Sequence, residues 1–328
     1  MAATANYGLA QSTWSAYRTA AKMLEKCANA VGISMDFPLT ENQVLAFVSW
    51  MLNRGLSSST MDTYLAGIRQ VHLVNGVNLP CLRTPLVKLV LEGRKHQDTA
   101  KKRAGLTTVR LPVTPKVLLL LKAELRASSM PKVDKLLCWA VATICFSGAL
   151  RIHEVLCRKE SSFDPHCTLL GRDITVRDTW IRKEKVPILQ LRLKSEKTDR
   201  IGADTILDIY ETKGQLCPLR AYKKWSAAAK EMGKCLPAFF TSEGKPLTGH
   251  GFNKLLKDCL GKHLDYKKGK VTSHSFRSGI ASLVASLGYT DEEIQALGRW
   301  SSAAYNSYIK LPRTRRLQMA REIGSLNL

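Results

Sequence analysis

The sequence lacks the cysteine pattern of a disulfide-bonded or zinc-binding protein. Its nine cysteines are an odd number, and no two of them form a C-x-x-C pair. His153 with Cys157 and His166 with Cys167 are isolated pairs, because neither has the two further ligands that a structural zinc site needs. These absences argue against both a disulfide framework and a metal site, and they favour a reducing compartment inside the cell.

Long apolar runs and targeting signals are also absent. The longest apolar stretches, 117–121 and 136–146, are too short or too interrupted to span a bilayer. The N-terminus has neither the basic region nor the apolar region of a secretion signal. We therefore expect a soluble intracellular protein, located in the nucleus if the source is eukaryotic and otherwise in the cytoplasm.

Acidic residues are scarce relative to basic ones. The chain has 27 Asp and Glu against 50 Lys and Arg, which gives a net charge of +23, and the excess is spread over residues 51–328. A hydrophobic content of 45% is ordinary for a globular protein. A folded chain with this much positive charge is typical of a protein whose partner is a polyanion. Nucleic acid is the first candidate, and an anionic membrane surface is the second.

Residues 8–97 show the apolar spacing of helices. Val44, Phe47, Val48 and Met51 are one example of this spacing. The segment 57–60, Ser-Ser-Ser-Thr, supplies N-cap candidates for a further helix. A short last helix is marked by Leu86, Leu89 and Val90. The pattern predicts a compact helical domain over residues 1–97.

A basic run follows this predicted domain. Between residues 94 and 103 the chain has five basic residues, one acidic residue and no apolar periodicity. Such a run is either a solvated linker or a linker that also follows a phosphate backbone. We predict an interdomain linker over 98–110, and the candidate DNA-binding residues are Arg94, Lys95, Lys101, Lys102 and Arg103.

The remainder of the chain, 111–328, predicts a second domain of mixed structure. Helical patterns cover 117–125 and 136–146, and the second is apolar nearly all round, which indicates burial. Helices are expected to resume after residue 218. Short β-prone runs joined by charged turns predict a small antiparallel sheet, with strands at 169–176, 186–193 and 205–210. The fold class expected for the whole chain is mainly α with this one sheet.

Four strings in the C-terminal two-thirds contain residues suited to phosphate chemistry. In the first, Arg151 and Glu154 lie in apolar sequence, where an unpaired charge would cost several kcal/mol. The second is a basic turn, Lys194–Asp199, between two predicted strands. The third, His274–Arg277, begins a helix whose first turn offers free backbone N–H groups to an anion. The fourth, Gly298–Ile309, is rich in aromatic residues.

Each string alone also has a structural explanation. These are, in order, an ion pair at i, i+3, a solvated hairpin, a satisfied histidine beside a surface arginine, and aromatic side chains in a core. Taken together and in this order, however, the strings resemble the tyrosine recombinase (phage integrase) family over about residues 110–310. The matching motifs are Ala149-Leu150-Arg151-Ile152-x-Glu154, Glu196-Lys197-Thr198, His274-x-x-Arg277, Gly298-Arg299-Trp300 and Tyr308-Ile309.

The resemblance implies a two-domain architecture, with a helical core-binding domain and an α+β catalytic domain. It also implies a site-specific DNA recombinase that cuts and rejoins strands through a covalent 3′-phosphotyrosine. Arginine suits the task because a guanidinium can hold two phosphate oxygens at once. The implied roles are Arg151 and Arg277 as the phosphate clamp, Glu154 as support for Arg151, Trp300 as an indole donor, Tyr308 as the nucleophile, His274 as its base, and Lys197 as the acid that protonates the leaving 5′ oxygen.

No cofactor is expected in this chemistry. The phosphotyrosine stores the bond energy, so ATP is unnecessary, and cationic side chains take the place of a divalent metal. The sequence has neither a phosphate-binding glycine loop nor the carboxylate cluster of a two-metal site.

Two assignments have a competitor nearby. Trp300 precedes Tyr308 by eight positions, where the family suggests about nine, and Tyr305 lies between them. The Tyr-Ile pairing favours Tyr308 over Tyr305. Lys194 lies in the same turn as Lys197, and the Lys-Thr dipeptide favours Lys197.

The resemblance further implies double-stranded DNA as the partner and a homo-oligomer, a dimer on one site and a tetramer in the synaptic complex. The basic tail 311–328 would dock on a neighbouring protomer, or alternatively on its own domain. Several strings look most like recombinases of eukaryotic mobile elements, the Crypton group and its relatives. The competing functions are strand relaxation like that of a type IB topoisomerase, a DNA-binding protein that no longer cuts, and a structural basic protein.

Overall fold

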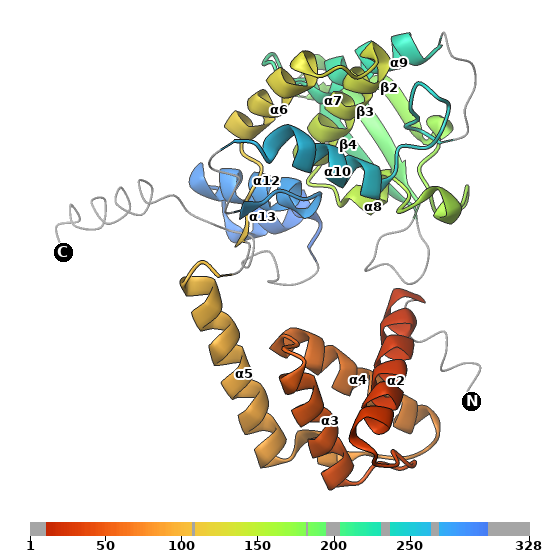
Figure 1. Ribbon diagram of the computed structural model, residues 1–328. Coiled ribbons are helices and arrows are strands. Elements are labelled where there is room, and N and C mark those ends of the chain that lie inside the picture. Colours follow the sequence, from red (N-terminus) through yellow and green to blue (C-terminus); the bar gives the residue numbers. More distant parts are fainter. Residues whose placement is uncertain are drawn as a thin grey trace, which may run out of the picture. The chain divides into compact units, whose positions relative to one another are not determined.

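The computed structural model describes residues 11–106, 109–181, 183–194, 204–230, 237–263 and 269–300. The chain divides into two compact units, Met1–Thr108 and Val109–Leu328 (Figure 1). Within the described ranges, no helix is long and apolar enough to cross a membrane. The two units are described separately below.

The first unit is helical, as the sequence predicts. Its helices are α2 (Gln11–Val31), α3 (Glu41–Asn53), α4 (Ser58–Val74) and α5 (Pro85–Arg103), with a 3-10 turn at Pro80–Arg83. Ser57 is the N-cap of α4, and its hydroxyl accepts a hydrogen bond from the backbone N–H of Thr60. The four apolar residues expected to face the core of α3 are all buried: Val44, Phe47, Val48 and Met51.

Helix α5 differs from the prediction in length and in its buried face. It has 19 residues and includes the whole basic run, so residues 98–103, where a linker was expected, are helical and belong to the first unit. Leu86 and Leu89, expected to mark its core face, are 50% and 70% exposed, whereas Val87 is buried. Lys and Arg are good helix formers, and basic residues in the last turn interact favourably with the helix dipole. A run without apolar periodicity can therefore still be helical.

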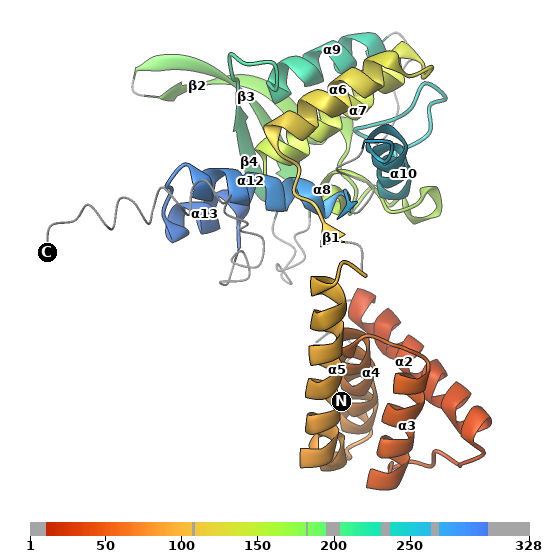
Figure 2. The same ribbon diagram turned by 60° about the vertical axis from the view of Figure 1, so that its left-hand side comes forward.

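The second unit contains the predicted antiparallel sheet, with strand order β2-β3-β4. The strands are β2 (Ile174–Ile181), β3 (Glu184–Leu193) and β4 (Thr205–Tyr210). In register, Ile174 faces Leu191 and Leu191 faces Leu207, which directs these apolar side chains to one face of the sheet. The β2–β3 hairpin projects beyond the helices (Figure 2). All three strands were expected from the sequence, although β2 begins later and extends further than predicted.

Helix α7 (Lys132–Ser147) is the centre of the second unit. Every residue from 137 to 146 in this helix is buried, as its apolar sequence predicts. It packs against its neighbours in the fold: α6 (Pro115–Ala127), α9 (Pro218–Lys230) and α12 (His274–Ser286). Among the described residues, this unit also contains the α-helices α8 (Ile152–Val155), α10 (Gly249–Leu260) and α13 (Asp291–Gly298).

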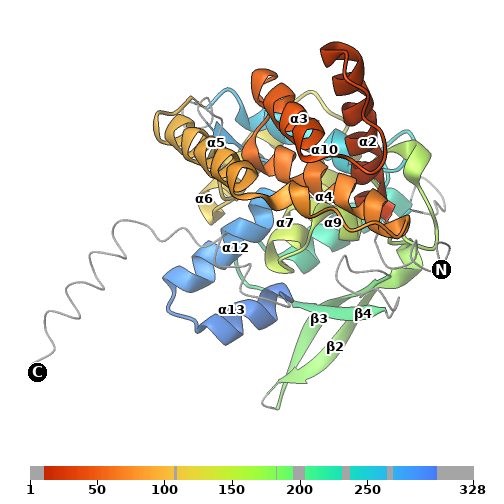
Figure 3. The same cartoon turned by 90° about the horizontal axis from the view of Figure 1, so that it is seen from below.

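The start of α12 is held against the chain that precedes α6. Strand β1 (Val109–Arg110) pairs in parallel with β5 (Gly269–Lys270), and the backbone N–H of Val113 donates to the carbonyl of Ser275 at 2.8 Å. A Cβ at Gly279 would lie 1.9 Å from the carbonyl oxygen of Val113, so only glycine allows this approach. Helices α12 and α13 then lie side by side (Figure 3). This arrangement brings the first turn of α12 and the last residue of α13 to the chain that leaves the C-terminal end of α7.

Candidate active site

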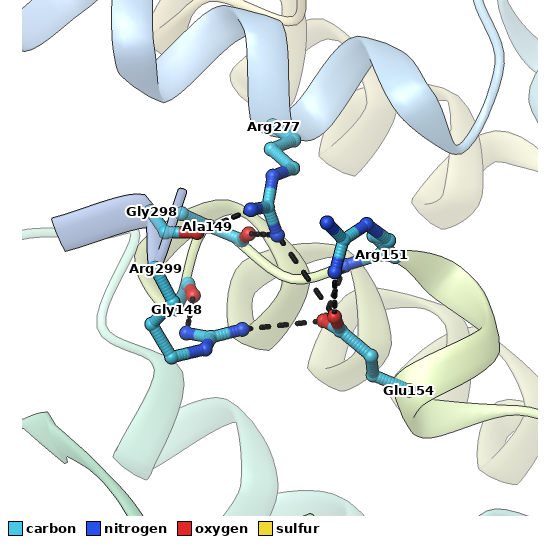
Figure 4. A network of polar contacts seen from close by, with 7 residues as sticks. All are labelled: Gly148, Ala149, Arg151, Glu154, Arg277, Gly298 and Arg299. Carbon is cyan, nitrogen blue, oxygen red and sulfur yellow. Dashed lines mark hydrogen bonds and ion pairs between the residues drawn. The ribbon is translucent and has the colours of Figure 1, made fainter. Parts of the chain in front are cut away.

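Three arginine side chains converge on the carboxylate of Glu154 (Figure 4). The distances to its oxygens are 2.7 Å from Nη1 of Arg151, 3.3 Å from Nη2 of Arg299 and 3.9 Å from Nη1 of Arg277. The Glu154 side chain is only 4% exposed. These four residues together have a net charge of +2, so the cluster favours an anionic ligand.

Arg151 lies where the chain leaves α7 and enters the short helix α8. It is the N-cap residue of α8, and its backbone N–H donates to Oε2 of Glu154 at 2.7 Å. The same carboxylate holds its guanidinium through Oε1. The ion pair considered from the sequence is therefore present, and it fixes both the backbone and the side chain of Arg151. The side chain is still 19% exposed.

Arg277 is the most deeply buried of the three arginines, with 2% of its surface exposed. Its Nη1 donates to the carbonyl of Ala149 at 3.0 Å, and its Nη2 donates to the carbonyl of Gly298. Its guanidinium also lies over the ring of Trp300, 4.6 Å from the centroid. These contacts hold the guanidinium between the turn after α7 and the turn after α13.

Trp300 is buried beside Arg277. A Cβ at Gly298 would lie 1.8 Å from the ring of Trp300, so this glycine makes room for the indole. The residue between them, Arg299, has a φ of +53° in the left-handed region. This conformation ends α13 and lets the side chains of Arg299 and Trp300 both reach the cluster.

Arg299 is a member of the cluster that sequence reasoning missed. Its Nη1 donates to the carbonyl of Gly148 at 3.1 Å, and its Nη2 reaches Glu154. In the sequence, the Gly-Arg-Trp string indicates a role for Trp300 and gives none to Arg299. The sequence signal for Arg299 was Gly298, because glycine is common at helix ends, where the chain changes direction and the side chain that follows can point toward the cluster.

His274 is the first residue of α12, one helical turn before Arg277, and its side chain is exposed. His153 on α8 interacts electrostatically with it. The pKa of His153 is lowered first by burial and then by the charges of Arg158 and His274. The sequence therefore places one histidine of the predicted site at a helix N-terminus, and the fold brings a second one near it.

The lysine that competed with Lys197 has a structural partner. Nζ of Lys194 lies 2.8 Å from Oδ2 of Asp173 and donates to the carbonyl of Pro165 at 2.7 Å. Its side chain is 7% exposed, and that of Asp173 is 1% exposed. Lys197, Tyr305 and Tyr308 lie outside the described residues, as does the tail 311–328.

The candidate DNA-binding residues divide into two groups. Lys101, Lys102 and Arg103 are exposed at the end of α5, and Lys95 is 67% exposed beside Glu92. Arg94 is a correction, because it is buried. Its Nη2 donates to the carbonyl of Gly55 at 2.9 Å, and its Nε lies 3.3 Å from Asp98. Arg94 thus joins α5 to the end of α3 and does not present its charge to a ligand.

No family model and no curated protein matches the chain. Solved structures do match it, at low identity. The Tn1549 transposon integrase in complex with transposon right end DNA matches with 14% identity and a TM-score of 0.60, over 97% of this chain and 95% of that one. The XerH site-specific recombinase in a post-cleavage complex with palindromic difH substrate matches with 13% identity and a TM-score of 0.57, over 92% and 76%.

A lambda integrase dimer bound to a COC′ core site matches with 15% identity and a TM-score of 0.54, over 92% of this chain and 90% of that one. In each case the likeness covers most of both chains, so it includes the helical unit and the unit with the sheet. The chain therefore has the two-domain fold of the tyrosine recombinases, mainly α with a small antiparallel sheet.

Proposed function

We propose that this chain is a site-specific DNA recombinase that cuts and rejoins DNA strands through a covalent 3′-phosphotyrosine. The observation that carries the proposal is the convergence of Arg151, Arg277 and Arg299 on the buried carboxylate of Glu154. One carboxylate orients three guanidinium groups and leaves the cluster positive. Such a cluster is suited to the charge that develops on a phosphodiester during transfer.

Arg151 and Arg277 would contact the two non-bridging oxygens of the scissile phosphate. A guanidinium has five N–H donors. Glu154 takes only one terminal nitrogen of Arg151, and the side chain keeps an exposed edge. Arg277 donates to two backbone carbonyl groups, which fixes the plane of its guanidinium. Both arginines are thus oriented before the phosphate arrives, so little reorganisation is needed in the reaction.

The covalent step would transfer the phosphoryl group to Tyr308. Its phenolic oxygen forms a bond to phosphorus while the bond to the 5′ oxygen of the next nucleotide breaks. His274, at the N-terminus of α12, accepts the phenolic proton, and Lys197 gives a proton to the departing oxygen. Rejoining is the reverse of this step with a new 5′ hydroxyl. The burial of Lys194 against Asp173 supports Lys197 as the acid.

The exposed basic end of α5 would contact the DNA backbone, and the two units, Met1–Thr108 and Val109–Leu328, would bind the same duplex. The three solved proteins are complexes with DNA, one of them a transposon integrase and one a dimer, which supports DNA binding by an oligomer. We extend this to integration or excision of a mobile element. The tail 311–328 would join neighbouring protomers.

The test is a covalent-trapping assay with nicked duplexes drawn from the flanks of the encoding gene. Cleavage close to the nick releases a short fragment with the free 5′ hydroxyl. Rejoining is then prevented, so the phosphotyrosine accumulates and is detected as a protein–DNA adduct. Tyr308→Phe removes only the phenolic oxygen, so it is expected to bind DNA without forming an adduct. Tyr305→Phe is the matched control and is expected to form one.

Two results would contradict the proposal. If Tyr308→Phe forms an adduct and mass spectrometry locates it on Tyr305, the nucleophile is Tyr305 and not Tyr308. The absence of an adduct with the wild type on every duplex, together with retained binding, would indicate a DNA-binding protein that does not cut.

A further inference from the structure

A second basic site lies in the unit with the sheet, at the opposite end of α7 from the arginine cluster. It is a pocket of about 280 Å³ between α6, α7 and the start of α9, which pack together in Figures 1 and 2. Its α7 wall includes Lys135, twelve residues before the end of the helix at Ser147. At 1.5 Å per residue, Lys135 is about 18 Å along α7 from the helix end that leads to Arg151.

The pocket has five cationic side chains from three helices and, among the described residues that line it, no acidic one. The five are Lys122, Arg126, Lys135, Arg220 and Lys224. In the part of the chain that the structure describes, none of them lies within ion-pair distance of a carboxylate. A nearby pocket between α6 and α10 is different, because Glu124 and Asp258 line it together with two lysines.

We propose that this pocket binds a compact anion of nucleotide size, with two or three phosphate groups and an apolar or aromatic part. The charge of the site requires an anion with several negative groups. Its volume lies at the lower end for small-molecule sites, and a DNA duplex could not enter it. The apolar part of the ligand would contact the large apolar side chains of the lining, Leu125, Leu136 and Trp139.

The cations in this pocket repel one another when it is empty. Burial lowers the pKa of Lys122, and the charges of Arg126, Lys224 and Arg220 lower it further. The ammonium group is therefore less stable here than in water. A bound polyphosphate would remove this repulsion, so part of the cost of assembling the cluster in the folded protein would be recovered as binding free energy.

Three of the five side chains are already held in place. Nζ of Lys122 lies 3.5 Å from the carbonyl and 3.4 Å from the side-chain oxygen of Gln215, and 5.2 Å from the centre of the Trp139 ring. Arg220 donates to the carbonyl of Lys213 at 2.7 Å, and Lys135 to that of Arg126 at 3.1 Å. Preorganised cations lose little conformational entropy when an anion binds.

The other two cations are at the rim. The side chains of Arg126 and Lys224 are exposed on α6 and α9. They can be replaced without opening the core, which makes them suitable for a test. We expect the phosphates to lie near Arg126 and Lys224 at the rim, and the apolar part of the ligand to lie deeper, near Trp139.

The test measures binding of ATP and of inorganic tripolyphosphate to the full-length protein by calorimetry at 0.15 M salt. We expect both to bind, with ATP at least threefold tighter because only ATP has a part that contacts the apolar wall. Arg126→Gln/Lys224→Gln should weaken both at least tenfold. Lys257→Gln, an exposed charge on α10, is the control and should change them less than twofold.

A second variant, Lys122→Gln, removes the lysine on the floor of the pocket and should also weaken binding. Thermal unfolding of each variant without ligand confirms that it is folded. The proposal is overturned if neither anion binds, if the pocket variants bind as tightly as the wild type, or if Lys257→Gln loses as much affinity as they do. It is also overturned if Arg126→Gln/Lys224→Gln lowers the affinity of the protein for a short DNA duplex tenfold, because these side chains would then bind the DNA backbone. None of these results depends on strand cleavage.

Discussion

Nη2 of Arg299 lies 3.3 Å from Oε2 of Glu154, and this contact joins the turn after α13 to the short helix α8. The same carboxylate also pairs with Arg151 beside it and approaches Arg277 of α12. Glu154 thus holds three positive side chains from separate segments. Its loss would leave these guanidinium groups facing each other in a nearly buried space.

The first prediction concerns this carboxylate. Glu154→Gln keeps the shape of the side chain but removes its charge, so the free energy of unfolding should fall by about 3 kcal/mol, as for other broken buried ion pairs. Urea unfolding measures the change. Glu243→Gln, which removes an exposed partner of Lys245, should lower the free energy of unfolding much less, because exposed ion pairs contribute little. Equal losses in the two variants would show that the cluster does not depend on Glu154.

The second prediction separates charge from geometry at the phosphate. Arg151→Lys and Arg277→Lys keep one positive charge each but cannot donate two parallel hydrogen bonds. Adduct formation should fall by about 10²-fold or more, the size of effect seen when one transition-state donor is lost, while duplex affinity stays within about twofold. Arg177→Lys, at an exposed pair with Asp208, is the control. Near-normal cleavage by Arg277→Lys would remove Arg277 from the catalytic set.

The third prediction distinguishes the two lysines of the hairpin. If Lys197 protonates the departing 5′ oxygen, a substrate with sulfur at that position should restore cleavage to Lys197→Ala, because a thiolate, with a thiol pKa of about 8.5, leaves without a proton. Lys194→Ala breaks a buried pair with Asp173. We expect it to lower the free energy of unfolding and to show no rescue by sulfur. Rescue of Lys194→Ala alone would reverse the two assignments.

The fourth prediction concerns the basic end of α5. Replacing Lys101, Lys102 and Arg103 with Ala should reduce the magnitude of the slope of log affinity against log salt by up to about three units. The reason is that binding releases fewer counterions when phosphate contacts are lost. Filter binding of duplex DNA at several salt concentrations measures the slope. Arg94→Ala should leave the slope unchanged and lower stability, since its guanidinium is buried against Gly55 and Asp98. A change of slope with Arg94→Ala would contradict the buried role.

The local parts of the fold could be read from the sequence because each rests on neighbouring residues. The apolar spacing in α3, the apolar sequence of α7 and the β-prone runs of β3 and β4 each reflect burial of one element. Helix α5 could not be read in this way. Its basic residues form a helix by propensity, and only packing decides that Val87 and not Leu86 or Leu89 faces the core.

The same division holds for the candidate site. The sequence by itself determined that the site is cationic and that Arg151 pairs with Glu154, because an i, i+3 contact needs only one turn of chain. The tertiary structure alone decided that Arg299 joins them and that Arg94 does not face a ligand. Arg299 reaches Glu154 because its left-handed backbone and its hydrogen bond to the carbonyl of Gly148 direct it there. Arg94 is buried because the carbonyl of Gly55, distant in sequence, accepts its hydrogen bond. Contacts of this kind depend on how the segments pack, which spacing along the chain does not encode.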